Sequence, residues 1–151
     1  MQRLLPPHLF ALLTVVSVVL GVRVPLVGPA PWPLRIIALV PFVVGARLTV
    51  ASARRFDELG TNIKTFDDPD HFVDDGAFRR TRNPMYLGFA AMLAGIAAAV
   101  GSLSAWVSPL VFVAAAERWY IPFEERRMAD RFGAVYEDYR RRVPRWIGVG
   151  A

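Results

Sequence analysis

The chain has 151 residues, of which 54% are hydrophobic, and its mean hydropathy of +0.35 exceeds that of ordinary soluble domains. It has no cysteine and two histidines, which excludes disulfides, thiol catalysis and cysteine-ligated metal and leaves little to form any metal site. The hydrophobic composition predicts an integral membrane protein. The net charge is +5, but acids accompany the bases, which argues against a nucleic-acid-binding protein.

The first apolar run, Leu9–Val22, is predicted to be a retained transmembrane helix. Only Arg3 precedes it as a charged residue, and prolines interrupt the small residues that follow it, so a cleaved signal peptide is the weaker alternative. We expect a proline-rich turn next, built from Pro25, Pro29, Pro31 and Pro33.

The second apolar run, Leu34–Ala53, completes two transmembrane helices within residues 1–55. Arg35 lies at its start and can snorkel to the interface, and Pro41 is expected to kink the helix. Arg47 lies deeper, and two interpretations stay open. It either snorkels to the surface or faces a water-accessible cavity.

A third apolar stretch, residues 83–116, contains no charged residue. As one helix its 34 residues would span about 50 Å, which is too long for a bilayer core of about 30 Å. Since Gly101–Ser104 offers a natural break, we predict a transmembrane hairpin over 83–121, with helices at Pro84–Val100 and Ala105–Tyr120.

The basic residues indicate the orientation of the chain in the membrane. They concentrate in the predicted loop 56–82 and in the tail after Pro122, whereas the hairpin turn carries none. Basic residues favour the cytoplasmic side. We therefore predict that both termini lie in the cytoplasm. Together, the predicted helices give a single all-α domain, 1–151, with about four crossings of the inner membrane.

The tail, 122–146, is predicted to be an amphipathic helix at the membrane surface. Its apolar side chains recur at spacings of three and four and would form one face, with charged residues opposite. Trp146 would then lie at headgroup level. The residues of this face are Met128, Phe132, Val135, Tyr136, Tyr139 and Val143.

Polar residues at the two ends of the hairpin are candidates for a site, although each has a structural explanation. Asn83 can cap the helix that begins at Pro84, and the Glu124–Glu125 pair suits the first turn of a helix. Glu117 is harder to explain structurally, because an unpaired carboxylate at a membrane-buried helix end is costly. Arg118 is an available partner.

Several motifs in a fixed order give the chain a resemblance to a known family. It resembles the isoprenylcysteine carboxyl methyltransferase-like family of integral membrane methyltransferases, which is related to the phospholipid methyltransferases, and it looks like a bacterial member. The resemblance covers about Phe56 to Trp146. It rests on Phe56-Asp57-Glu58-Leu59-Gly60-Thr61, Asp75-Gly76-Ala77-Phe78-Arg79, Arg82-Asn83-Pro84-Met85-Tyr86-Leu87-Gly88, Glu124-Glu125, Phe132-Gly133, Tyr136, Tyr139 and Val143.

The resemblance implies S-adenosylmethionine as cofactor, enclosed at the cytoplasmic face. Arg82 can pair with its carboxylate, and Glu124 or Glu125 can pair with its ammonium. Aromatic rings can contact the adenine or the sulfonium. We therefore predict Glu124 and Arg82 as catalytic residues. The predicted cofactor-binding residues are Arg82, Asn83, Tyr86, Leu87, Glu117, Trp119, Glu124, Glu125 and Tyr136.

One departure from the family pattern concerns the acceptor. Where the family frequently has histidine this chain has Asn83, which cannot accept a proton at neutral pH. The acceptor is expected to be a hydrophobic or amphiphilic carboxyl, thiol or amine compound, with membrane lipids around the protein and an oligomer or second subunit as a further expectation. Two alternatives stay open: a non-catalytic helical membrane protein, and a membrane reductase on a related scaffold.

Overall fold

The computed structural model describes residues 4–26, 31–60 and 71–148, and every regular element in these ranges is helical. Residues 27–30 of the predicted proline turn, and 61–70 of the predicted loop, lie outside the described part of the chain. The predicted all-α class is confirmed for the described residues.

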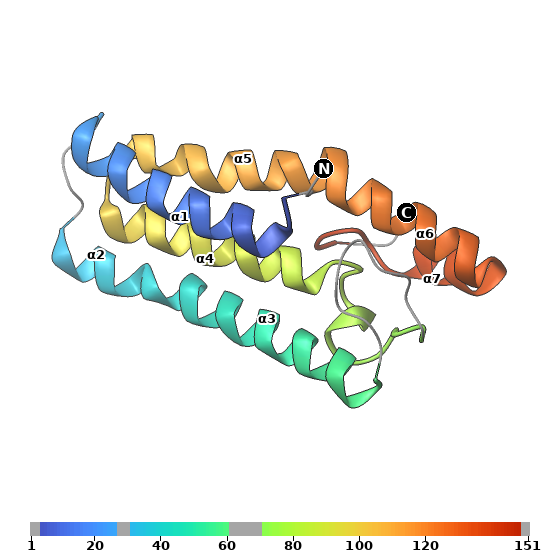
Figure 1. Ribbon diagram of the computed structural model, residues 1–151. Coiled ribbons are helices and arrows are strands. Elements are labelled where there is room, and N and C mark those ends of the chain that lie inside the picture. The colour runs from blue at the N-terminus through green and yellow to red at the C-terminus, as the bar shows by residue number, and fades with distance from the viewer. Residues whose placement is uncertain (1–3, 27–30, 61–70, 149–151) are drawn as a thin grey trace.

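The long helices lie side by side as elongated rods (Figure 1). They are α1 (Pro6–Arg23), α3 (Leu39–Glu58), which continues the short α2 (Trp32–Ile37), α4 (Pro84–Val100) and α5 (Val107–Ala115). At one end of this bundle α6 (Ile121–Phe132) and α7 (Ala134–Arg142) project beyond the rods, close to the start of α1 (Figure 1).

The first two predicted helices form where the apolar runs place them, and the second is interrupted as expected. Helix α2 ends at Ile37 and α3 begins at Leu39, with a turn at Ala38. Pro41 has no N–H to donate to the Ile37 carbonyl four residues earlier, and its ring crowds that carbonyl. This accounts for the break three residues before the proline.

Two helical stretches among the described residues are long and apolar enough to cross a bilayer. They are Pro6–Arg23, whose 18 residues have a mean hydropathy of 1.6, and Trp32–Glu58, whose most apolar 18 residues have a mean hydropathy of 2.0. Many of their large apolar side chains point away from the protein, as a lipid environment requires. The hairpin helix Pro84–Val100 is apolar but shorter, so four crossings stay a prediction.

The predicted hairpin forms with its first helix at the predicted bounds. Gly101 ends α4 in the left-handed conformation, at φ 76° and ψ 22°, which glycine adopts without steric cost. The chain returns through the 3₁₀ helix η2 (Leu103–Trp106) into α5. Two serines tie this turn to α1: Ser17 Oγ donates to the Ala105 carbonyl and Ser104 Oγ to the Leu20 carbonyl, each at 3.0 Å.

The second hairpin helix differs from the prediction because it does not end at Tyr120. A π-helical segment, η3 (Ala116–Tyr120), carries α5 directly into α6. The tail also differs from the single predicted helix 122–146. It breaks at Gly133, which has φ 51°, and helical structure ends at Arg142.

The face predicted to lie on the membrane packs largely against the protein itself. Tyr136, Tyr139 and Val143 are buried and form a small core with Phe72 and Phe132. The main core lies between α1, α4 and α5 and contains Leu9, Leu13, Tyr86, Phe89, Met92, Leu93, Phe112, Ala115, Ala116, Tyr120 and Ile121. From the predicted face, Val135 is exposed.

The segment before α4 is held to α3 by an ion pair. Arg55 Nε donates to Asp75 Oδ1 at 2.9 Å, and its guanidinium holds the pKa of the Asp75 carboxyl below its ordinary value. The 3₁₀ helix η1 (Gly76–Arg79) follows at once, and Phe78 from it meets the Phe56 ring edge-on, with centroids 5.3 Å apart. These contacts position the residues that lead into α4.

Helices α3 and α4 approach each other through glycines. A Cβ atom at Gly45 would lie 2.5 Å from the Gly88 carbonyl oxygen, and one at Gly88 would lie 2.6 Å from the Gly45 carbonyl oxygen. Small residues of this kind allow close helix contact in lipid. Any side chain here would push the two backbones apart.

We therefore expect Gly45→Val to reduce the free energy of unfolding by about 1–3 kcal/mol, the usual cost of overpacking. The measurement is thermal unfolding in detergent micelles. Ala51→Val is the matched control, because Ala51 is exposed on the same helix. Equal unfolding temperatures for the two variants would contradict the close contact.

Candidate functional site

A cavity of about 310 Å³ lies where the start of α4 faces α6 and α7. This volume is at the lower end of the range of about 300–1,000 Å³ typical of small-molecule sites. Its apolar walls include Phe56, Val73, Phe78, Met85, Phe89 and Met128, together with residues 5–7 ahead of and within the start of α1.

Six of the nine predicted site residues line this cavity: Arg82, Asn83, Tyr86, Glu124, Glu125 and Tyr136. The other three do not. Leu87 follows the lining residue Tyr86 on α4, Glu117 lies on η3, and Trp119 is 69% exposed. Arg47 is exposed and is likewise not among the lining residues.

Arg82 and Glu125 form an ion pair that is almost completely buried. The Arg82 Nη1 atom lies 2.9 Å from Glu125 Oε1, and the two side chains are only 10% and 12% exposed. This contact is an ion pair and not a hydrogen bond, and among the described residues Arg82 Nε and Nη1 are buried donors without a hydrogen-bonded acceptor. Buried donors of a charged group are costly when unsatisfied. Arg82 therefore keeps hydrogen-bonding capacity that the described residues do not use.

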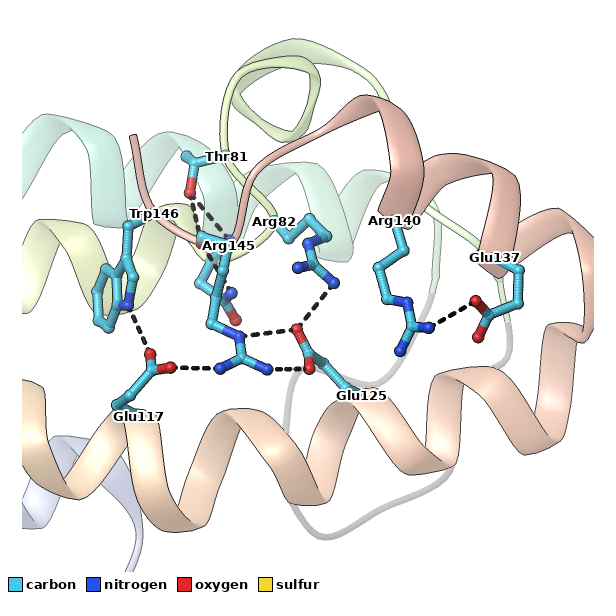
Figure 2. Close-up of polar contacts among 9 residues, drawn as sticks. Thr81, Arg82, Glu117, Glu125, Glu137, Arg140, Arg145 and Trp146 are labelled. Atoms are coloured by element: carbon cyan, nitrogen blue, oxygen red, sulfur yellow. Dashed lines mark hydrogen bonds and ion pairs between the residues drawn. The ribbon is translucent and has the colours of Figure 1, made fainter. Parts of the chain in front are cut away.

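A second arginine, Arg145, holds the other side of the same carboxylate (Figure 2). Its Nε donates to Glu125 Oε1 at 3.1 Å and its Nη2 to Glu125 Oε2 at 2.5 Å. The Arg145 Nη1 atom donates to Glu117, whose other oxygen accepts from Trp146 Nε1 at 2.7 Å. Glu117 is thus paired with Arg145 and Trp146, where the sequence had offered Arg118.

The backbone around Arg145 is tied to the residues that precede α4. The Arg82 N–H donates to the Pro144 carbonyl at 2.9 Å, while Thr81 Oγ1 and Asn83 Nδ2 donate to the Arg145 carbonyl at 3.1 and 2.9 Å. Asn83 occupies the predicted N-cap position, but its side chain makes no capping bond. The side-chain amide of Asn83 donates to the Arg145 carbonyl instead.

Glu124 lies on the cavity side of α6 and is oriented by Tyr86. The Tyr86 hydroxyl donates to Glu124 Oε1 at 2.8 Å. The Tyr86 ring is 5% exposed and stacks on Tyr120, with centroids 6.1 Å apart. A carboxylate held in this way beside aromatic rings is suited to a cationic ligand group.

Two tyrosines of α7 close the far wall of the cavity. Burial raises the pKa of Tyr136, and the negative charge of Glu125 raises it further, while Arg82 opposes both effects. Burial also raises the pKa of Tyr139, whose hydroxyl donates to the Phe78 carbonyl at 2.8 Å. Both phenols therefore stay neutral at physiological pH and act as hydrogen-bonding groups, not as bases.

Arg145 was not among the predicted site residues. It was one of many arginines in the tail and served only to indicate orientation. Its position after Pro144 and before Trp146, beyond the amphipathic pattern, was the available signal. His71 and Arg127 also line the cavity and were not predicted. Among the described residues, no group of three or more metal-ligating side chains is assembled.

Comparison with known families gives one match. The family model described as phospholipid methyltransferase matches residues 34–135, more than half of the chain. The predicted family is thereby confirmed, whereas the narrower isoprenylcysteine grouping stays a prediction. Comparisons with curated proteins and with solved structures gave no match.

Thr81 and Asn83 both donate to the Arg145 carbonyl, and this predicts how the two side chains contribute to stability. We expect Asn83→Ala and Thr81→Val each to reduce the free energy of unfolding by about 1 kcal/mol, since each removes one donor. The double variant should lose more than the sum, because the carbonyl then has no donor among the described residues.

Thermal unfolding in micelles measures the three values, and Thr81→Ser, which keeps the hydroxyl, is the control. Strictly additive losses would contradict the idea that the two side chains serve one acceptor.

Proposed function

The chain belongs to the phospholipid methyltransferase family, and from this premise we propose that it is an S-adenosylmethionine-dependent methyltransferase of the cytoplasmic membrane face. Family membership itself implies a membrane-associated methyltransferase. The methyl donor and the kind of acceptor are the parts we add. The acceptor is a hydrophobic or amphiphilic compound with a carboxyl, thiol or amine group.

The observation that carries this proposal is the presence of Arg82 and Glu124 in one cavity. Arg82 and Glu124 line the same cavity, and among the described residues the Nε and Nη1 atoms of Arg82 have no hydrogen-bonded acceptor. An amino-acid group carries a carboxylate and an ammonium close together, so it can meet both side chains at once. Arg82 binds the carboxylate by charge-assisted hydrogen bonds, and Glu124 binds the ammonium.

The remaining lining residues suit the rest of the donor. When bound, S-adenosylmethionine supplies a methyl group on a positively charged sulfur. The rings of Tyr86 and Tyr136 stabilise positive charge and stack against flat groups. Apolar side chains such as Phe56, Phe78 and Met128 exclude water, which favours displacement at an aligned methyl group.

The chemistry of Asn83 restricts the role of this chain in proton transfer. An amide does not accept a proton at neutral pH, and Tyr136 and Tyr139 are neutral phenols. A carboxylate or a thiolate can take the methyl group without a base, whereas an ammonium must lose a proton first. The residues at the start of α4 therefore orient the reactants and do not act as the base.

An apolar entrance supports a membrane-soluble acceptor. Leu5, Pro6 and Pro7 line the cavity from the start of α1, and exposed apolar side chains cover the outer faces of α1 and α3. An amphiphile can approach along these surfaces while the charged residues face water. This arrangement lets donor and acceptor enter by separate routes.

Binding of S-adenosylhomocysteine, the demethylated donor, tests the proposal. We expect Arg82→Gln and Glu124→Gln each to raise its Kd about tenfold or more, because each removes a charged partner. Isothermal titration of the purified protein in detergent gives the values.

Arg131→Gln and Asp130→Asn are the matched controls, because both residues are exposed on α6 and do not line the cavity. Absence of binding by the wild-type protein at millimolar ligand would refute the proposed donor.

The proposed topology has four crossings, with the hairpin turn outside and α6 in the cytoplasm. The chain has no cysteine, so single cysteines report accessibility without background. We expect Leu103→Cys, at a turn position that is 59% exposed, to react with a membrane-impermeant maleimide in intact cells. Asp130→Cys should react only after the membrane is permeabilised. Reaction of both from the same side would contradict this topology.

A further inference from the structure

The carboxylate of Glu125 is fixed on both of its oxygens. Arg145 makes a two-point contact with it, through Nε at 3.1 Å and Nη2 at 2.5 Å. A fork of this kind prevents the carboxylate from rotating. Oxygen Oε1, which Arg145 shares, is the one that lies 2.9 Å from Arg82 Nη1.

Arg145 is in turn held by Glu117, on the side away from Glu125. Its third nitrogen, Nη1, donates to Glu117, which is also held by Trp146 Nε1. Glu117 does not line the cavity. Its carboxylate therefore acts on Arg145 and not on a ligand. Figure 2 shows the resulting row of Trp146, Glu117, Arg145, Glu125 and Arg82 along η3 and α6.

The backbone keeps the two arginines in register. The Arg82 N–H bonds to the Pro144 carbonyl, and the neighbours of Arg82 on both sides donate to the Arg145 carbonyl. Two guanidiniums that approach one buried carboxylate repel each other, and this cost is met only while the carboxylate lies between them. The orientation of Arg82 thus depends on Glu125, and that of Glu125 on Arg145.

We propose that Arg145 is a positioning residue for the donor site, anchored by Glu117 and acting through Glu125 on Arg82. This deepens and rests on the proposed function. Arg145 does not line the cavity and lies outside the residues that the family model matches. By holding Glu125, it keeps the Arg82 guanidinium oriented at the cavity wall for the carboxylate of the ligand.

The proposal predicts that Arg145→Lys weakens binding although it keeps the charge, because lysine cannot form the two-point contact. We expect its Kd for S-adenosylhomocysteine to rise about tenfold. Glu117→Gln should shift the Kd in the same direction although Glu117 does not reach the cavity. Trp146→Phe, which removes one hydrogen bond, should have a smaller effect.

A double-mutant cycle separates positioning from general structural support. In a Glu125→Gln background, Arg145→Lys should change the Kd by less than twofold, since its route to Arg82 is already broken. Arg141→Lys, an exposed change on α7, is the control. Thermal unfolding of each variant identifies any loss of folded protein.

The outcomes distinguish the two proposals. If wild type binds the ligand but Arg145→Lys binds equally well, positioning by Arg145 is refuted while the donor proposal stands. Independent, additive effects of Arg145→Lys and Glu125→Gln would also refute it. If wild type does not bind, the donor proposal itself fails. If Arg145→Lys does not fold, the Kd values of Glu117→Gln and Trp146→Phe test positioning by Arg145, and a Kd equal to that of wild type for both variants would refute it.

Discussion

The site depends on one carboxylate that lies between two guanidiniums. Glu125 meets Arg82 on one side and Arg145 on the other, at a position where the carboxylate is only 12% exposed. Removing any of the three would leave uncompensated charge in a poorly solvated place, which is far more costly than losing a surface ion pair. Three segments far apart in the sequence are thereby brought to one point: the approach to α4, helix α6 and residues 144–146.

The helical scaffold keeps those three segments at fixed distances. Glycine contacts bring α3 and α4 together, and the ion pair of Arg55 and Asp75 extends this rigid part to the chain just ahead of Arg82. On the other side, η3 carries α5 into α6 without a loop, so Glu117 and Glu125 belong to one continuous helical rod. π-Helical turns are frequent at functional sites. Here the turn lies where the rod passes from the apolar core to the charged cavity.

Much of the bundle could be predicted because its causes are local. Pro84 at the first helical turn, an uncharged run, and Gly101 in the left-handed conformation fix α4 from residues within it. The break at Gly133 was missed because apolar residues continue at helical spacing across it, from Phe132 to Tyr136. Asn83 was correctly placed at the N-cap, but the carbonyl that its side chain bonds comes from residue 145. In the sequence Arg145 resembles the arginines near it. What distinguishes it is its contact with Glu125 and Glu117, which lie 20 and 28 residues earlier in the chain.

The position of residues 144–146 along the chain has a consequence for biosynthesis. They follow every helix of the described chain, so during translation the apolar helices leave the ribosome and can enter the bilayer first. Until Arg145 emerges, Glu117 and Glu125 lack the guanidinium that joins them. A nonsense or frameshift mutation after codon 142 would therefore leave a product that inserts normally but has a disordered arrangement of charges at its cavity.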